Sequence, residues 1–268
     1  MIRRTLSGMT AGLLMAMGAN DLVAQSARVG STPMRRVVAA ATLAAASVTL
    51  ALAQTTTPRS LLQQVDHLVY ATPDLDLGIA AIEKRIGVRA TAGGQHPGLG
   101  TRNALIALGP ASYLEIIGPD PDQPKPAGPR RFGLDELKSP RLLTWVAKGA
   151  ELDALVAKAK AGGVALGAVL PGSRKRPDGV VLSWRYTDPN TVLADRLVPF
   201  FIDWGQSPHP SATAAPGATL VQLRAEHPDP DRAQKLIDAL GLDLRVSRGS
   251  AVTLIATIDG PRGRVELR

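Results

Sequence analysis

The feature that most constrains the fold is a unit that occurs three times along the chain. Each unit consists of a strand, an amphipathic helix that ends at glycine, and three further strands. In the first unit, residues 65–71 alternate in polarity and are rich in β-branched side chains, as in a strand. The next segment places Ile79, Ile82 and Ile86 on one helical face, and Gly87 ends it. The remaining strands of this unit are expected at residues 88–92, 102–108 and 112–118.

The second and third units repeat the same order of elements. Residues 142–147 open the second unit, whose helix ends at Gly162. Residues 220–225 open the third unit, whose helix is capped at Asp229 and ends at Gly241. The later strands of these two units are expected at residues 164–170, 180–186, 197–203, 242–247, 252–258 and 264–267. Strands and helices in this order predict an α+β protein.

The units and the segments between them divide the chain into seven parts. Two of the connecting parts are rich in Pro, which is typical of ordered surface connections or semi-rigid linkers. The expected parts are a targeting region at 1–53, a linker at 54–64, a first module at 65–118, a Pro-rich connection at 119–140, a second module at 141–206, a linker at 207–217 and a third module at 218–268.

The N-terminal region has the pattern of a secretory signal. Arg35 and Arg36 precede residues 37–53, which carry no charge and end in the small-residue pattern Ala-Leu-Ala. We therefore expect a periplasmic or secreted protein that is cleaved after Ala53 and has no stable membrane insertion after cleavage. The alternative is an uncleaved N-terminal membrane anchor, since the apolar stretch is barely long enough to span a bilayer. Residues 1–33 resemble a second, weaker signal, so Met34 is the expected true start.

Composition excludes several kinds of site. The 268 residues include no Cys, so disulfides, thiolate metal sites and a Cys nucleophile are excluded. The net charge is +8, but the basic residues are dispersed, and no aromatic residues alternate with them as in a nucleic-acid interface. Two small basic clusters, at residues 130–131 and 174–176, are interpreted as solvated loop tips. The expected partner is a small-molecule ligand and not a nucleic acid.

A His and a Glu in the first unit give the best indication of chemistry. His67 lies on the first strand and Glu115 on the last, where a shared cavity can bring them together. An acid on a concave sheet face is costly unless it binds a cation or a hydrogen-bonding partner. His67 is therefore a candidate metal ligand or general base, and Glu115 a candidate ligand or proton carrier. The alternatives are a packed His67 bonded to Asp66, and a salt bridge from Glu115 to Arg102.

Other candidate residues surround this pair. His96 lies in a glycine-rich segment, residues 93–100, which predicts a rim over the cavity, where a His binds substrate or carries a proton. The alternative for His96 is an exposed loop residue. Arg102 and Asn103 are candidates for holding an anionic or carbonyl-bearing ligand. Asp203 lies among three aromatic residues and is a secondary candidate for substrate binding. His209 and His227 are assigned no role, and the sequence shows no Ser/His/Asp triad.

Four motifs, at residues 66–70, 96–105, 113–120 and 199–204, resemble those of glyoxalase-like domain proteins. These proteins belong to the vicinal oxygen chelate (VOC) superfamily, and the resemblance covers roughly residues 65–268. It implies that two βαβββ modules pair, so that curved mixed sheets surround a cleft. Because the superfamily contains enzymes and binding proteins, it does not fix the activity.

The resemblance also implies a set of metal ligands from the first and last strands of the paired modules. It assigns His67 and Glu115 as ligands of a divalent metal ion (Zn, Ni, Mn or Fe), and the last strands of the later units offer Asp203 and Glu266. The first strand of the second unit has no His, and that of the third has at best Gln222.

Two functions follow as hypotheses. One is a metal-dependent lyase or dioxygenase that acts on a small oxygenated substrate, with Glu115 or His96 moving a proton. The other is a metal-free protein that sequesters a small molecule in the same cleft.

Overall fold

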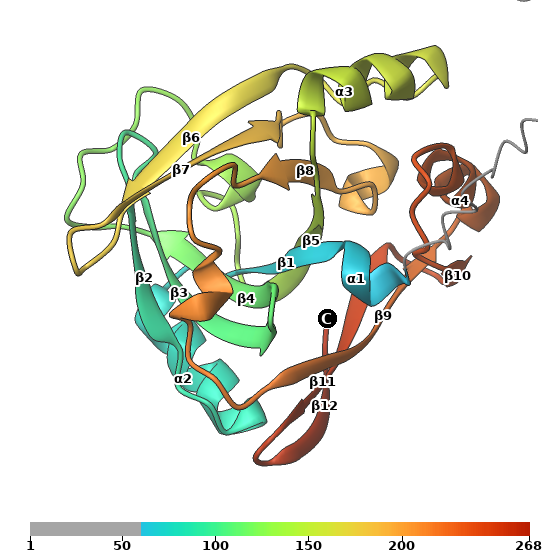
Figure 1. Ribbon diagram of the computed structural model, residues 1–268. Coiled ribbons are helices and arrows are strands. Elements are labelled where there is room, and N and C mark those ends of the chain that lie inside the picture. The colour runs from blue at the N-terminus through green and yellow to red at the C-terminus, as the bar shows by residue number, and fades with distance from the viewer. Residues whose placement is uncertain (1–59) are drawn as a thin grey trace, which may run out of the picture. The chain divides into compact units, whose positions relative to one another are not determined.

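Eight strands of the first two units close into a barrel, as the computed structural model shows (Figure 1). The structure describes residues 60–268, so the expected signal region at 1–53 and most of the linker at 54–64 lie outside the described residues. The strand order around the barrel is β1-β4-β3-β2-β6-β7-β8-β5. The prediction of curved mixed sheets is confirmed, and the principal sheet is closed.

The first module contributes four neighbouring barrel strands. After the short helix α1 (Leu61–Gln64), its elements are β1 (Val65–Ala71), α2 (Leu75–Ile86), β2 (Thr91–His96), β3 (Thr101–Gly109) and β4 (Ser112–Pro119). Asp74 caps α2 by accepting a hydrogen bond from the backbone N–H of Leu77, and Gly87 ends the helix with φ 86°. The first strand pairs in parallel with the last, β4.

The second module repeats this pattern on the other side of the barrel. Its elements are β5 (Arg141–Lys148), α3 (Leu152–Ala161), β6 (Val169–Lys175), β7 (Val181–Thr187) and β8 (Phe200–Asp203). Its first strand, β5, likewise pairs in parallel with its last, β8. The two modules join where β1 runs antiparallel to β5 and where Gln95 of β2 pairs with Lys175 of β6.

The second join explains why two strand predictions are displaced. The predicted strand at 88–92 lies instead at 91–96, and the one at 164–170 lies at 169–175. Gly93 and Gly94 belong to the segment that was expected to form a rim over the cavity, but they lie inside β2. A Cβ atom on Gly94 would lie 2.5 Å from the carbonyl oxygen of Lys175, so this glycine allows β2 and β6 to approach closely.

The third unit has the predicted order of elements but forms a separate sheet. Its elements are β9 (Thr219–His227), α4 (Pro230–Ala239), β10 (Val246–Arg248), β11 (Thr253–Gly260) and β12 (Gly263–Leu267), in the strand order β10-β9-β11-β12. Its first strand pairs in parallel with β10 and not with the last strand, so its topology differs from that of the two barrel modules.

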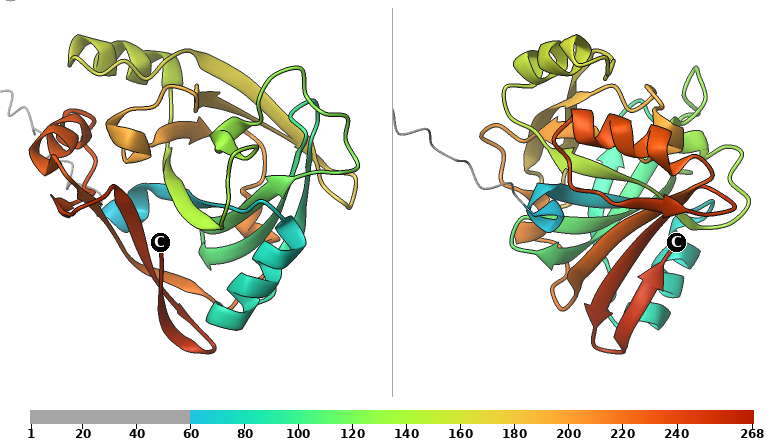
Figure 2. Two further views of the ribbon diagram at one scale, coloured as in Figure 1. Left: turned by 180° about the vertical axis from the view of Figure 1, so that it is seen from behind. Right: turned by 90° about the vertical axis from the view of Figure 1, so that its right-hand side faces the viewer.

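The C-terminal sheet packs on the outside of the barrel (Figure 2). The backbone N–H of Leu142 in β5 donates to the carbonyl oxygen of Arg268, 2.8 Å away. Gly260 touches the end of α2, where a Cβ atom would lie 2.5 Å from the carbonyl oxygen of Ile86. An aliphatic core that includes Ile82, Ile86 and Ile258 continues from the barrel into this sheet. The sheet therefore supports the barrel from outside.

Three short 3-10 helices interrupt the connections. They are η1 (Arg131–Gly133), η2 (Ala194–Arg196) and η3 (Pro210–Ala212). The segment after η3 lies alongside β3 in space. There the backbone N–H of Ala107 donates to the carbonyl oxygen of Ala215 over 2.8 Å. Among residues 60–268, no helix combines the length and the apolar character needed to cross a bilayer.

Candidate functional site

The barrel encloses a cavity lined by residues from both modules. Its volume is about 80 Å³, several times the volume that one water molecule needs. The chain has only three Trp, three Tyr and three Phe residues, and two of each kind line this cavity. They are Tyr113, Phe132, Trp184, Tyr186, Phe200 and Trp204. The scarce aromatic residues are thus concentrated around one internal space.

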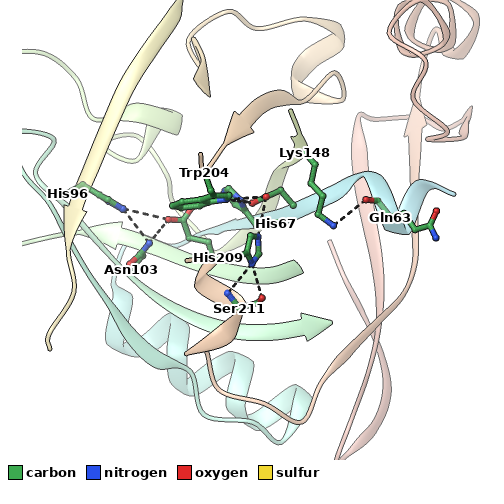
Figure 3. Close-up of polar contacts among 10 residues, drawn as sticks. Gln63, His67, His96, Asn103, Lys148, Trp204, His209 and Ser211 are labelled. Atoms are coloured by element: carbon green, nitrogen blue, oxygen red, sulfur yellow. Dashed lines mark hydrogen bonds and ion pairs between the residues drawn. The ribbon is translucent and has the colours of Figure 1, made fainter. Parts of the chain in front are cut away.

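An irregularity in β1 brings two neighbouring side chains together at this cavity. In the pairing of β1 with β5, Val65 lies opposite Ala147 and His67 lies opposite Val146, so Asp66 is an extra residue. Successive side chains of a regular strand point to opposite faces, and a bulge changes that direction locally. The carboxylate oxygen Oδ1 of Asp66 lies 2.7 Å from Nδ1 of His67. Figure 3 shows polar contacts in this region, with His67, Trp204 and His209 close together.

The carboxylate of Asp66 is buried and accepts hydrogen bonds from several side chains. Nε1 of Trp204 donates to it over 3.2 and 3.3 Å, and Nε2 of His209 lies 3.2 Å from Oδ2. Burial alone would raise the pKa of Asp66, but the hydrogen bonds from His209 and His67, with their charges, lower this pKa to about 2. Because Asp66 is ionised at neutral pH, Nδ1 of His67 is the donor, and Nε2 carries the lone pair.

Glu115 lies opposite this lone pair. Its Oε2 is 3.9 Å from Nε2 of His67, and its Oε1 accepts a 2.5 Å hydrogen bond from Nδ2 of Asn103. Nε2 of His96 lies 3.8 Å from the same Oε1, and Nδ1 of His96 lies 2.9 Å from the hydroxyl of Thr101. Burial lowers the pKa of His96, against the opposing effect of Glu115, so His96 is neutral at neutral pH.

The structure therefore brings together four of the six predicted site residues. His67, His96, Asn103 and Glu115 line the cavity, and all four are at most 9% exposed. The expectation that His96 is either a rim residue or an exposed loop residue is wrong, because β2 extends to residue 96 and carries its side chain inward.

The other two predicted residues lie elsewhere. Arg102 points away from the cavity and pairs with Asp76 over 3.0 Å, so the expected alternative of a salt bridge to Glu115 is wrong. Asp203 accepts a hydrogen bond from the N–H of Gly205. Ile202 lines the cavity, and strand alternation therefore directs Asp203 outward. Glu266, in the C-terminal sheet, pairs with two arginines outside the barrel.

Two arginines that the sequence analysis assigned to solvated loop tips also line the cavity. Arg174 is only 4% exposed, because β6 continues through the predicted tip and places this residue on its inner face. Arg131 lies with its guanidinium carbon 5.1 Å from the centre of the Tyr186 ring. The signal that could have identified Arg174 is the alternation of Leu170, Gly172 and Arg174, which places it on the same face as Gly172.

His209 was assigned no role, but it fixes Asp66 from outside the cavity. Its Nδ1 lies 2.8 Å from Oγ of Ser211, so that Ser211, His209 and Asp66 resemble a nucleophilic triad. The hydroxyl of Ser211, however, donates to the carbonyl of Pro110, and its backbone N–H donates to Nδ1 of His209. Neither Ser211 nor His209 lines the cavity, and this group serves to hold the carboxylate of Asp66. His227 bonds to Asp195, away from the barrel interior.

The predicted metal ion fits these residues poorly. Within the described part of the chain, no three His, Asp or Glu side chains are arranged to hold a metal ion. The second module presents Tyr186, Phe200 and Ile202 to the cavity where further ligands would be needed. Arg131 and Arg174 line the same space, and their positive charges oppose the binding of a cation. The donors His67 and Glu115 alone do not complete a metal site.

Comparison with solved structures finds matches of low sequence identity. A hypothetical protein from Staphylococcus aureus has a TM-score of 0.51 and 14% identity, over 75% of this chain and 83% of that chain. Methylmalonyl-CoA epimerase from Mycobacterium tuberculosis has a TM-score of 0.39 and 19% identity, over 59% of this chain and 98% of that chain. The epimerase from Streptomyces coelicolor, in complex with 2-nitronate-propionyl-CoA, has a TM-score of 0.39 and 18% identity, over 55% and 97%.

The comparison with protein families is more specific. No curated protein matches the chain. The family model described as "Glyoxalase-like domain" matches residues 65–241, which contain the whole barrel together with β9 and α4. The chain therefore belongs to the glyoxalase-like domain family, within the vicinal oxygen chelate superfamily.

Proposed function

We propose that the protein binds a small oxygenated molecule in the barrel cavity and transfers a proton to or from it, with His67 as the base. One observation carries this proposal. Asp66 accepts a hydrogen bond from Nδ1 of His67, which leaves the lone pair of Nε2 directed at Glu115 across the cavity. An imidazole held in one tautomer by a carboxylate is prepared to accept a proton at its other nitrogen.

The surrounding charges suit that transfer. A proton taken from a carbon beside a carbonyl leaves its electron pair on the carbonyl oxygen as an enolate. The imidazolium that forms on His67 lies between the carboxylates of Asp66 and Glu115, which stabilise its charge. Arg131 and Arg174 line the same cavity and supply positive potential for the enolate oxygen.

The metal-dependent reaction and the binding protein are the two competing functions. His67 and Glu115 favour the first, because both direct donor atoms at the cavity, whereas the aromatic lining favours the second. Elemental analysis of the purified protein tests the first. We expect no stoichiometric Zn, Ni, Mn or Fe. A bound metal that is lost in both His67→Ala and Glu115→Ala would establish a metal centre instead.

Isotope exchange tests the proposed function itself. The protein is incubated in D2O with pyruvate, phenylpyruvate or hydroxyacetone, and loss of the proton beside the carbonyl is followed by ¹H NMR. We expect exchange above the uncatalysed rate with at least one of them, and its loss in His67→Gln. His227→Gln is the matched control, because this His lies outside the cavity and should leave the rate unchanged. Binding without any exchange would contradict proton transfer and support sequestration.

We also propose that the protein is exported, on the basis of the basic and apolar segments at residues 34–53. Expression of the full chain in a Gram-negative host, followed by fractionation and N-terminal sequencing, tests this. A periplasmic product that begins at Gln54 is expected. A membrane-bound product that keeps residues 37–53 would support the alternative of an N-terminal anchor.

A further inference from the structure

We propose that the ligand is a small, flat carboxylate whose anionic group binds Arg174. This inference deepens the proposed function by naming the class of molecule that the cavity accepts. It rests on Arg174 itself, on the cation beside it, and on the aromatic side chains that surround both.

Arg174 is buried and, among the described residues, forms no ion pair with a carboxylate. Its side chain lines the cavity, and Nη1 donates to the carbonyl oxygen of Gly93. In the described range, this is its one hydrogen bond, and no carboxylate lies within ion-pair distance of it. A buried guanidinium has five N–H donors, and leaving them without acceptors is costly. Burial accordingly lowers the pKa of Arg174 from its usual value.

A second cation, Arg131, lies at the same end of the cavity as Arg174 and is suited to the same anionic ligand. Arg131 and Arg174 both lower the pKa of His96 through their charges, so both cations act on the same end of the cavity. The charge of Glu115 raises the pKa of Arg174, against the effect of burial, but Glu115 forms no ion pair with the guanidinium, and its Oε1 accepts from the amide of Asn103. A ligand carboxylate can accept two parallel hydrogen bonds from a guanidinium, which suits this unfilled position.

The rest of the lining defines the body of the ligand. Trp184, Tyr186 and Phe200 form a connected aromatic surface, in which Tyr186 lies 6.5 Å from Trp184 and 6.3 Å from Phe200 between ring centres. Phe132 stacks on Phe200 with a centroid distance of 6.3 Å. Such surfaces bind flat apolar groups, since aromatic rings prefer offset or edge contacts with one another. The cavity therefore suits an aromatic or otherwise planar acid.

Binding of benzoate and of benzamide tests this inference. The two probes share their shape, but only benzoate carries a charge. Trp184 and Trp204 line the cavity, so quenching of Trp fluorescence reports occupancy, and calorimetry provides an independent Kd. For the unaltered protein we expect benzoate to bind at least tenfold more tightly than benzamide.

The decisive variant is Arg174→Gln, with Arg176→Gln as its matched control. Arg176 lies two residues further along the same hairpin and pairs with Asp178 outside the cavity. Arg174→Gln should weaken benzoate binding by about tenfold to a hundredfold and leave benzamide unchanged. Arg176→Gln should change neither. If Arg174→Gln does not fold, Arg174→Lys serves instead, and it should keep some preference for benzoate while binding it more weakly.

The outcomes separate this inference from the proposed function. Equal affinity of the unaltered protein for the two probes, or an unchanged preference in Arg174→Gln, would overturn the carboxylate site even if isotope exchange occurs. A preference for benzoate that persists in His67→Gln supports the site independently of proton transfer. If no substrate exchanges while Arg174 still controls binding, the catalytic proposal fails and the ligand class stands.

Discussion

The two modules of the barrel have the same strand pairing but line the cavity with different chemistry. The first module supplies His67, His96, Asn103 and Glu115, whereas the second supplies Trp184, Tyr186, Phe200 and Arg174. In each module the first strand pairs in parallel with the last, so the difference lies in the side chains and not in the backbone. The first module thus provides the groups proposed to transfer a proton, and the second module provides the surface proposed to bind the ligand.

This division has a physical reason. Buried polar groups are stable only when they satisfy one another, which requires them to lie close together. In the first module Asn103 donates to Glu115, His96 lies 2.9 Å from the hydroxyl of Thr101, and His67 bonds to Asp66. The predictions below test whether the two halves are separable in function.

The largest expected effect is on proton transfer in Asp66→Asn. An amide can donate to Nδ1 of His67 and so favour the tautomer that carries its proton on Nε2, the nitrogen that must act as the base. We expect the exchange rate to fall by about 10²- to 10⁴-fold. Binding of benzoate, which depends on the second module, should change by less than about threefold. A rate within a few-fold of the unaltered protein would show that Asp66 does not control His67.

The next effect is on stability against acid. The pKa of Asp66 is lowered to about 2 from 3.8, so its contribution is fully present above pH 4 and is lost as the pH falls through 2. A shift of this size corresponds to about 2 kcal/mol. Urea unfolding at pH 7, 4, 3 and 2 should show a fall of about this size that is missing in Asp66→Asn. Parallel curves for the two proteins would contradict it.

A smaller effect is expected when Asn103 is displaced. A Cβ atom on Gly93 would lie 2.2 Å from Oδ1 of Asn103, so Gly93→Ala must move the amide that donates to Glu115. The exchange rate should fall about tenfold, as expected when one hydrogen bond to a charged group is lost. Gly128→Ala is the control, because a Cβ atom there meets nothing within 4 Å. Equal rates in the two variants would exclude a role for the amide.

The smallest effect is expected when an aromatic side chain of the second module is replaced. Phe200→Leu removes the ring contacts to Phe132 and Tyr186 and should weaken binding of benzoate by about threefold to tenfold. The exchange rate at saturating substrate should stay within twofold, since no group that moves a proton is altered. A fall in that rate with unchanged affinity would show that the two halves are not separable.

The sequence predicted the first module well because its pattern is local. The predicted first strand at 65–71 and the last at 112–118 match β1 and β4 closely, and the isoleucines and Gly87 define α2. His67 and Glu115 meet in the cavity because β1 and β4 are hydrogen-bonded neighbours.

Other features depend on pairing between distant segments. Whether β6 extends to Lys175, and so buries Arg174, is decided by its contact with β2, some eighty residues away. The β1 bulge that brings Asp66 alongside His67 depends on pairing with β5. The third unit has the same order of elements as the others, yet its first strand pairs with its second. These pairings cannot be read from the polarity of single segments.

The most direct test of the account is the tautomer of His67, measured by two-dimensional ¹H–¹⁵N NMR of the imidazole nitrogens at neutral pH. His67→Gln assigns the signals. The structure predicts a proton on Nδ1, hydrogen-bonded to Asp66, and an unprotonated Nε2. A proton on Nε2 and a bare Nδ1 would contradict the claim that His67 presents a base to the cavity.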